Sequence, residues 1–184
     1  IEGRKVIVFS NPEYRQCRVD IAFNPVPGGI MESNPDQEAI SILEYILCGS
    51  SLTSRMGVEL RDKQGLSYGV KSNLWIREEG GYWNIRTNTD KTRVVRMIRG
   101  MFDEIRKIQK DGVTAEELEK AKARKIGLLT MYVRTPDEAG YIVYDQIKTG
   151  RPIDYFDRKR ERIMSVTLDD VKAAANRYLD TKNY

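Results

Sequence analysis

The chain has 184 residues, and its 31 basic side chains against 27 acidic ones give a net charge of +4. This length suits one folded domain, and an apolar share of 40% with 32% charged residues is typical of globular proteins rather than disordered ones. Because the chain has no histidine, Ser-His-Asp catalysis, Cys-His catalysis and histidine zinc sites are all excluded. We therefore expect no metal ion to be held by this chain alone.

The charge distribution gives little support for nucleic-acid binding. Basic residues mostly alternate with acidic ones, and the run at 158–162 (RKRER) is better explained as a solvated helix face. Aromatic residues do not alternate with basic ones, as base stacking would require. No apolar run approaches the roughly 18 residues of a membrane-spanning helix. We expect neither nucleic acid nor a membrane as a partner.

The two cysteines, Cys17 and Cys48, lie far apart in the sequence, each within an apolar pattern. This setting favours buried free thiols, because an unpaired cysteine packs as a small apolar residue. The sequence leaves a disulfide open, since pairing depends on the distance between the two residues in the fold.

The two ends suggest an excised piece of a longer protein. Residues 1–4 (IEGR) match the recognition sequence of a clotting protease that is used to remove tags, although a natural stretch could read the same. The chain has no initiator methionine and stops just after a predicted helix. Because no repeat or low-complexity linker divides it, we expect residues 1–184 to form a single domain.

Four segments have the pattern of β-strands. Residues 5–9 (KVIVF) are a short β-type run, and residues 17–23 alternate apolar and polar side chains as a half-buried strand does. Residues 66–76 and 81–88 are expected to pair as a hairpin around a turn at 78–81.

The remaining segments predict helices, because good N-cap residues precede apolar side chains that repeat with the helical period. Two T-x-x-E capping boxes, at Thr114 and Thr135, are the clearest of these signals. The last predicted helix should place Leu168 and Val171 inward. Strands and helices alternate too unevenly for a doubly wound sheet, so the sequence favours an α+β fold. The predicted helix starts are Asn34, about residue 52, Thr89 or Asp90, Thr114, Thr135, Asp154 and Thr167.

Three segments together resemble the second, metal-free domain of the insulinase-like zinc peptidases. Residues 54–70 (SRMGVELRDKQGLSYGV) are similar to the family run SRL…ELR-x-K-x-GL-x-Y-x-V. Residues 112–122 (GVTAEELEKAK) are similar to the family motif GVT-x-EEL-x-x-AK, and residues 162–171 (RIMSVTLDDV) to the motif RI-x-x-VT-x-x-DV. The order and spacing fit from about Arg4 to Tyr184, and the likeness is greatest to the C-terminal half of the bacterial two-domain type.

The resemblance implies a mixed, largely antiparallel sheet with helices packed on one face. It also implies a partner, the zinc-bearing N-terminal half, which lies in the same polypeptide or in a separate subunit. This chain would hold no cofactor, would be inactive alone, and would contact a peptide substrate together with that half. The family domain usually ends in another short strand, which a boundary after Tyr184 would have removed.

In active family members the second half lends an arginine and a tyrosine, with six residues between them, to the zinc site. Arg61 and Tyr68 match that spacing. Tyr68 would stabilise the transition state, and Arg61 would hold Tyr68 and bind a peptide carbonyl of the substrate. Simpler explanations exist for both residues. Tyrosine is favoured in strands for packing, and a cation is favoured near a helix C-terminus. The strand aromatics Trp75, Tyr82 and Trp83 are expected in the core or at the contact between halves.

The function expected from the resemblance is that of the non-metal half of a zinc metalloendopeptidase acting on peptides or unfolded polypeptides. The alternative is a non-catalytic structural subunit related to the respiratory-chain core proteins, which does not need the arginine–tyrosine pair. A bacterial cytoplasm or periplasm is the compartment that fits this family, and the sequence does not decide between them.

Overall fold

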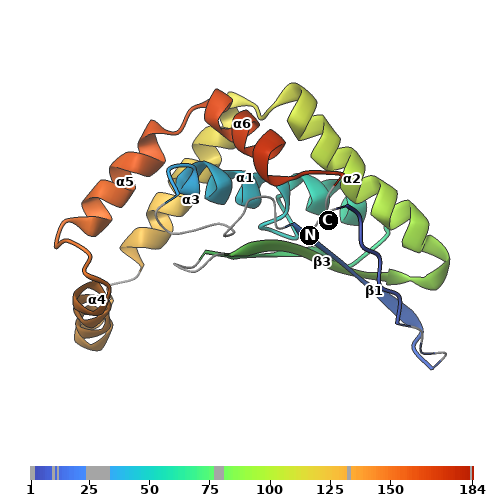
Figure 1. Cartoon of the computed structure of the whole chain (residues 1–184), viewed down its shortest axis with the longest axis horizontal. Coiled ribbons are helices and arrows are strands. Elements are labelled where there is room, and N and C mark those ends of the chain that lie inside the picture. Colours follow the sequence, from blue (N-terminus) through green and yellow to red (C-terminus); the bar gives the residue numbers. More distant parts are fainter. Residues whose placement is uncertain are drawn as a thin grey trace.

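The sheet is small and antiparallel in the computed structural model, which describes residues 3–9, 11, 13–23, 34–76, 81–131, 134–182 and 184. Its strands follow the order β1-β3-β2, so β3 lies in the middle. The helices cover one face of it, and α4 lies apart at one end of the arch (Figure 1). This arrangement confirms the predicted α+β fold with helices on one face. The strands are β1 (Gln16–Phe23), β2 (Val70–Trp75) and β3 (Tyr82–Asp90).

The helices begin and end near the predicted signals. Both predicted capping boxes form, since the Thr114 and Thr135 hydroxyls accept hydrogen bonds from the backbone N–H groups of Glu117 and Glu138. Thr167 forms a third box with Asp170. The helical segments are α1 (Gln37–Leu47), η1 (Gly57–Lys63), η2 (Lys91–Arg93), α2 (Val94–Asp111), α3 (Ala115–Thr130), α4 (Pro136–Thr149), α5 (Tyr155–Ser165) and α6 (Leu168–Tyr178).

Three details at helix starts differ from the prediction. The helix expected from about residue 52 begins later, as η1 at Gly57. The first helix begins at Gln37, because the Asn34 side chain accepts a hydrogen bond from the backbone N–H of Asp36 and forms a turn before the helix. The Asn34 amide also donates to the Tyr178 hydroxyl at 2.7 Å, which ties this turn to α6. Leu168, predicted to face inward, is exposed on the first turn of α6, whereas Val171 is buried as expected.

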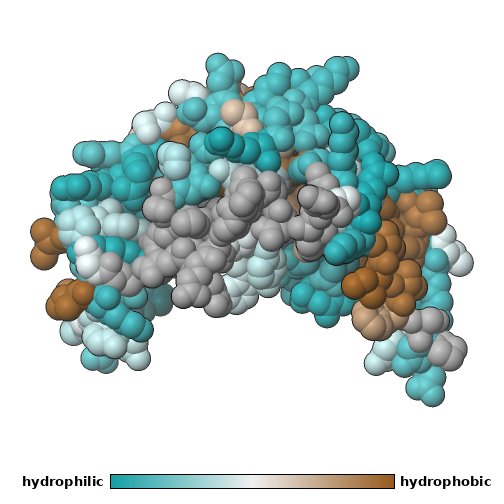
Figure 2. Space-filling model, in the orientation of Figure 1, coloured by the Kyte–Doolittle hydropathy of each residue, from teal (hydrophilic) through white to brown (hydrophobic). Residues whose placement is uncertain are grey.

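The predicted strand at 5–9 does not form. Its side chains Val6, Ile7, Val8 and Phe9 are 76–92% exposed. The Lys5 N–H donates to the Tyr184 carbonyl at 3.0 Å, but within the described residues no strand pairs with this segment through backbone hydrogen bonds. A strand requires a neighbour that pairs its backbone groups, so an apolar β-type composition was not sufficient here. Figure 2 shows hydrophobic side chains gathered beside β1, where this segment runs in Figure 1.

The core lies between the sheet and the helices α1, α2 and α6. Trp83 of β3 is fully buried there, and its indole N–H donates to the Ser72 hydroxyl at 2.8 Å. Trp75 and Tyr82 lie on the opposite, open face of the sheet, because side chains alternate along a strand. Their rings are stacked with centroids 6.2 Å apart, and each is just under half exposed. Of the three predicted aromatics, only Trp83 is therefore a core residue.

The β2–β3 pairing confirms the predicted hairpin partners, although its turn at 78–81 lies mostly outside the described residues. The basic run at 158–162 is on α5 and is largely exposed, but Lys159 and Arg162 reach the buried Glu38 of α1 at 3.8 and 3.6 Å. In the part of the chain that the structure describes, no helix is both long and apolar enough to cross a membrane.

Candidate functional site

Tyr68 lies on the connection between η1 and β2, residues 64–69. The connection begins where η1 ends, and Gly65 takes a left-handed conformation with φ of +60°, which favours glycine. The Leu66 N–H then donates to the Leu60 carbonyl at 2.8 Å. On the far side of the turn, the Arg93 guanidinium donates to the Gly65 carbonyl at 2.9 Å. These contacts fix the entry to the connection before it reaches Tyr68.

Side-chain hydroxyls from β3 hold the backbone on both sides of Tyr68. The Thr89 hydroxyl donates to the Leu66 carbonyl at 2.7 Å. The Thr87 hydroxyl lies 2.8 Å from the Ser67 hydroxyl and 3.0 Å from the Gly69 carbonyl, so its single proton bonds one of them at a time. Both threonines are 3% exposed or less. Because a buried hydroxyl without a partner is costly, these bonds are strongly favoured in the folded state.

Ser67 and Gly69 complete this arrangement. The Gly69 N–H donates to the Ser67 hydroxyl at 2.8 Å, and that hydroxyl in turn lies 2.7 Å from the Gly69 carbonyl. A side chain at Gly69 would meet Ser51, because an added Cβ would lie 2.6 Å from the Ser51 Oγ. Ser51 itself donates to the Val70 carbonyl at 3.0 Å. The residues before and after Tyr68 are therefore closely constrained.

The Tyr68 side chain is 93% exposed. The predicted strand at 66–76 starts only at Val70, so Tyr68 does not lie in a strand and does not pack against the sheet. The strand begins late because hydroxyls of β3, rather than backbone ladder bonds, take the carbonyls of Leu66 and Gly69. Packing against the sheet therefore does not explain this tyrosine within the described residues.

Arg61 lies in η1, whose backbone bonds are of the rare π type that is often found at functional sites. Its side chain is one-third exposed and lies 3.3 Å from the Asp62 carboxylate. The Arg61 carbonyl accepts hydrogen bonds from the N–H groups of Gln64 and Gly65. Within the described residues no hydrogen bond joins Arg61 to Tyr68. The structure thus places both on one continuous segment, without a direct hydrogen bond between them.

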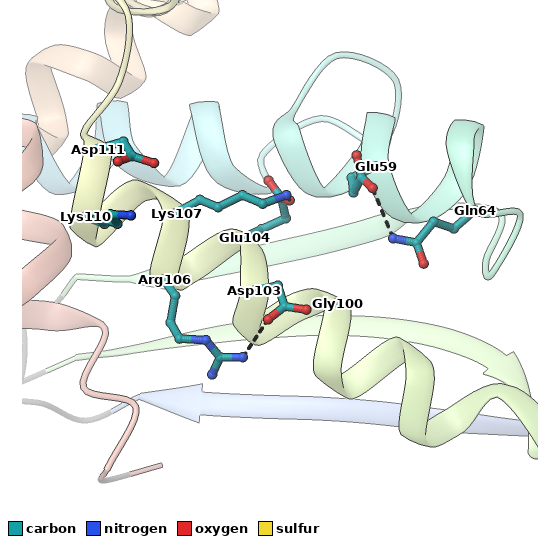
Figure 3. A pocket seen from close by; sticks show the side chains of 9 residues that line it. All are labelled: Glu59, Gln64, Gly100, Asp103, Glu104, Arg106, Lys107, Lys110 and Asp111. Atoms are coloured by element: carbon teal, nitrogen blue, oxygen red, sulfur yellow. Dashed lines mark hydrogen bonds and ion pairs between the residues drawn. The ribbon is translucent and has the colours of Figure 1, made fainter.

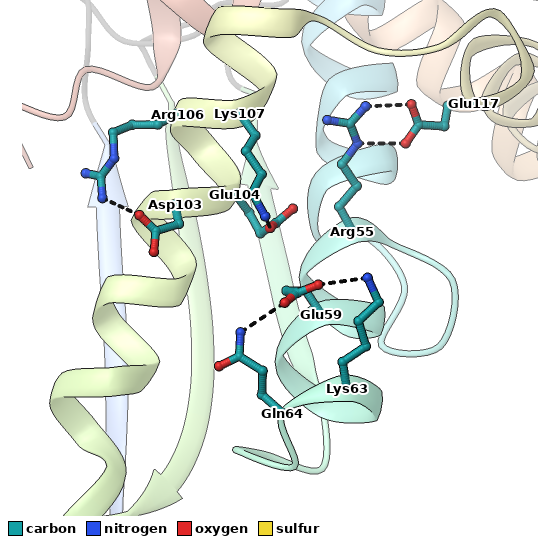
Figure 4. Close-up of polar contacts among 9 residues, drawn as sticks. All are labelled: Arg55, Glu59, Lys63, Gln64, Asp103, Glu104, Arg106, Lys107 and Glu117. Carbon is teal, nitrogen blue, oxygen red and sulfur yellow. Dashed lines mark hydrogen bonds and ion pairs between the residues drawn. The ribbon is translucent and has the colours of Figure 1, made fainter.

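A bidentate ion pair anchors the start of η1 to the helices behind it. The Arg55 Nε and Nη2 each donate to a Glu117 carboxylate oxygen at 2.7 Å, and Nη2 also donates to the Gly112 carbonyl at 3.1 Å (Figure 4). Glu117 is also the acidic member of the capping box of α3. One carboxylate therefore links the capping of α3 to the position of η1.

Glu117 should make stability depend on pH. Partial burial by itself raises the pKa of Glu117, but hydrogen bonds from Arg55 and the Thr114 N–H outweigh it and lower the pKa below its ordinary value near 4.5. A lowered folded-state pKa means that the ionised carboxylate stabilises the fold above about pH 4.5, and that this contribution is lost as pH falls through the folded-state pKa. We expect Glu117→Gln to lower the melting temperature at pH 7. The difference from the parent chain should shrink toward about pH 2, because the contribution of the ionised carboxylate is lost as pH falls.

Thermal melts of both chains across this pH range would check this expectation. Glu116→Gln is the matched control, because Glu116 pairs with Lys120 on the fully solvated surface, where such pairs contribute little. A melting difference for Glu117→Gln that is the same at both pH values would contradict the expectation.

A polar pocket of about 400 Å³ lies between η1 and α2 (Figure 3). Its charged side chains are largely paired with each other: Lys107 donates to Glu104 at 2.6 Å, and Arg106 donates to Asp103 at 2.6 Å. Glu59 accepts from Lys63 and Gln64. Because these charged groups already have partners, few are left to bind a ligand. The pocket is therefore a weaker candidate for a functional site than the exposed Tyr68.

The described residues contain no group of three or more His, Cys, Asp or Glu side chains that could hold a metal ion. Cys17 and Cys48 are both free thiols, as predicted. Cys48 is buried as expected, whereas Cys17, also expected to be buried, is partly exposed. Burial raises the pKa of the Cys48 thiol, so it stays protonated and unreactive. Neither the acidic residues nor the cysteines therefore offer this chain a metal centre within the part described.

Reasoning from the sequence missed the hydroxyls that hold the connection. Thr87 and Thr89 stand on the face of β3 that points to the helices, in line with the buried Trp83 and Ile85, where an alternating strand would carry apolar residues. Two polar residues on a buried face were the available signal. Their partners lie about 20 residues earlier in the chain, and only the fold brings them together.

Comparison with known proteins identifies a family. The sequence model described as "Peptidase M16 inactive domain" matches residues 1–125. A relative from Mycobacterium bovis named as an uncharacterized zinc protease is 28% identical over 149 residues, which is 79% of this chain and 33% of the relative. The chain spans about a third of the length of this curated relative.

Solved structures agree with this match. The peptidase M16 inactive domain from Pseudomonas fluorescens has a TM-score of 0.76 and 26% identity, covering 91% of this chain and 39% of that one. A chain of Complex III2 from Candida albicans has a TM-score of 0.73 and 11% identity, covering 94% and 42%. The second likeness concerns the fold alone. The family match over residues 1–125 shows that this chain belongs to the peptidase M16 family as an inactive domain.

Proposed function

We propose that this chain is the non-metal half of a zinc-dependent metalloendopeptidase and supplies Tyr68 and Arg61 to a zinc site on its partner half. Its substrates would be peptides or unfolded polypeptides, and residues 1–184 would form one domain of the complete enzyme. The chain has no histidine, and the described residues offer no metal-binding group, so the metal has to come from the other half.

The observation that carries this proposal is the combination of an almost fully exposed Tyr68 with a closely bonded backbone around it. An exposed tyrosine adds little to stability, so the stability of the isolated domain does not explain why a tyrosine stands at position 68. A phenol hydroxyl held at a fixed place can donate a hydrogen bond to an oxygen that becomes negative during amide hydrolysis. Zinc on the partner half would polarise the scissile carbonyl and activate water.

Arg61 would act on the substrate rather than on Tyr68. Its guanidinium is partly exposed and can bind peptide carbonyls, because its planar fork presents several N–H donors in a fixed arrangement. The contact to Asp62 joins neighbouring residues at 3.3 Å, and such an exposed pair is weak enough to be exchanged for a substrate contact.

The alternative role is a structural subunit without catalysis. The likeness to a chain of Complex III2 from Candida albicans is compatible with it, but a likeness of fold does not assign a function. A scaffold has no use for an exposed, well-oriented tyrosine, and the relative from Mycobacterium bovis is named as an uncharacterized zinc protease. These two points favour the enzyme.

Reconstitution tests the proposal. The full-length protein, and this chain mixed with the separately produced remainder, would be assayed for cleavage of fluorescein-labelled casein and for bound zinc. We expect cleavage and zinc in the full-length protein, zinc in the remainder, and neither zinc nor cleavage in this chain alone. A full-length protein that binds no zinc and cleaves nothing would support the scaffold instead.

A further inference from the structure

The hydroxyl cluster next to Tyr68 is unusual in its position. Thr87 is the residue of β3 that pairs with Val70, the first residue of β2. Before Val70 the backbone hydrogen bonds between β2 and β3 end, and the hydroxyls of Thr87 and Thr89 bond the chain instead. The chain thus leaves the sheet immediately before Val70, while the residues on each side of Tyr68 stay bonded to β3.

We propose that Thr87 is a positioning residue for Tyr68. Its hydroxyl contacts Ser67 on one side of the tyrosine and the Gly69 carbonyl on the other, at 2.8 and 3.0 Å. The two neighbours of Tyr68 are therefore fixed by one buried side chain, and the direction in which the tyrosine leaves the backbone follows from them. This inference rests on the proposed function, because it concerns how Tyr68 is presented to the zinc half.

The chemistry favours positioning over a purely stabilising role. A valine at position 87 would fill the same space and would suit the strand at least as well as threonine. The hydroxyl is needed only because polar groups of residues 67–69 are turned toward it. If those residues continued the strand, their backbone groups would pair with β3 directly, and Tyr68 would lie against the sheet rather than in solvent.

The test is a double-mutant cycle in the full-length enzyme with fluorescein-labelled casein. Thr87→Val is expected to lower kcat by about ten- to a hundredfold with little change in KM, because a small displacement of a group that acts in the transition state has this effect. Thr87→Ser, which keeps the hydroxyl, should restore kcat. In a Tyr68→Phe background, Thr87→Val should have no further effect on kcat, since the hydroxyl being positioned is already absent.

Ser72→Ala is the matched structural control. It removes a hydroxyl from the same strand pair and leaves the buried Trp83 indole without its partner, yet it lies away from Tyr68. We expect it to lower the melting temperature without lowering kcat. If Thr87→Val fails to fold, Ser67→Ala replaces it in the cycle, because it removes the hydroxyl between Thr87 and Gly69.

The possible outcomes separate the two proposals. If Tyr68→Phe lowers kcat and Thr87→Val does not, the positioning role is wrong while the proposed function stands. If Thr87→Val lowers kcat equally with tyrosine or phenylalanine at position 68, Thr87 acts independently of Tyr68 and the positioning role is also wrong. If Tyr68→Phe leaves kcat unchanged, the part assigned to Tyr68 in the proposed function fails, and the positioning role fails with it.

Discussion

Tyr68→Phe in the full-length enzyme is expected to lower kcat by about 100- to 1,000-fold, the loss typical of removing one donor to a developing oxyanion. The substitution removes one oxygen atom and leaves the ring. Because Tyr68 is 93% exposed and its hydroxyl makes no hydrogen bond within the described residues, the fold should be unaffected. The loss would therefore affect the bond-breaking step and not the fold, and it should appear in kcat rather than in KM.

Steady-state cleavage of labelled casein, together with a thermal melt of the same preparation, measures this effect. Tyr82→Phe is the matched control, since Tyr82 is also an exposed aromatic of this chain but stacks on Trp75 away from the η1–β2 connection. It should keep the parent kcat. Parent-like activity of Tyr68→Phe would remove Tyr68 from the catalytic machinery.

Trp83→Ala should lower the free energy of unfolding far more than Trp75→Ala does. The indole is fully buried between the sheet and the helices, and its N–H is bonded to Ser72. Truncating a buried tryptophan leaves a cavity and costs about 3–5 kcal/mol. For a chain of this size, that corresponds to a fall of roughly 10 °C in melting temperature.

Trp75→Ala is the comparison that makes this measurement informative. Trp75 lies on β2 and, like Trp83, within the same antiparallel pair, but it is 43% exposed and stacks on the half-exposed Tyr82. Its loss should cost about 1 kcal/mol, the usual contribution of an aromatic pair. Urea denaturation of the 184-residue chain would separate the two substitutions. Equal losses would mean that the open face of the sheet is covered in the folded chain.

The candidate site was only partly predictable. The run at 54–70 pointed to Arg61 and Tyr68 through its resemblance to a family, and the structure places both on the segment from η1 to β2. The exposure of Tyr68 was not predictable, because local sequence favours a strand that includes it. The carbonyls of Leu66 and Gly69 could pair either with backbone N–H groups or with threonine hydroxyls, and only the packed β3 decides between these partners.

The sequence alone determined the features that depend on neighbours within a few residues. Thr114, Thr135 and Thr167 begin helices because each side chain accepts a hydrogen bond from the N–H three residues ahead. At 17–23 the alternation of apolar and polar residues favours a strand with one buried face. The tertiary structure alone decided whether each apolar run found a partner. Residues 5–9 have the composition of a strand, but no strand within the described residues pairs with them. β2 begins only at Val70, because threonine hydroxyls of β3 bond the carbonyls of the residues before it. Strand pairing joins groups distant in the chain, and its free energy belongs to the pair rather than to either segment.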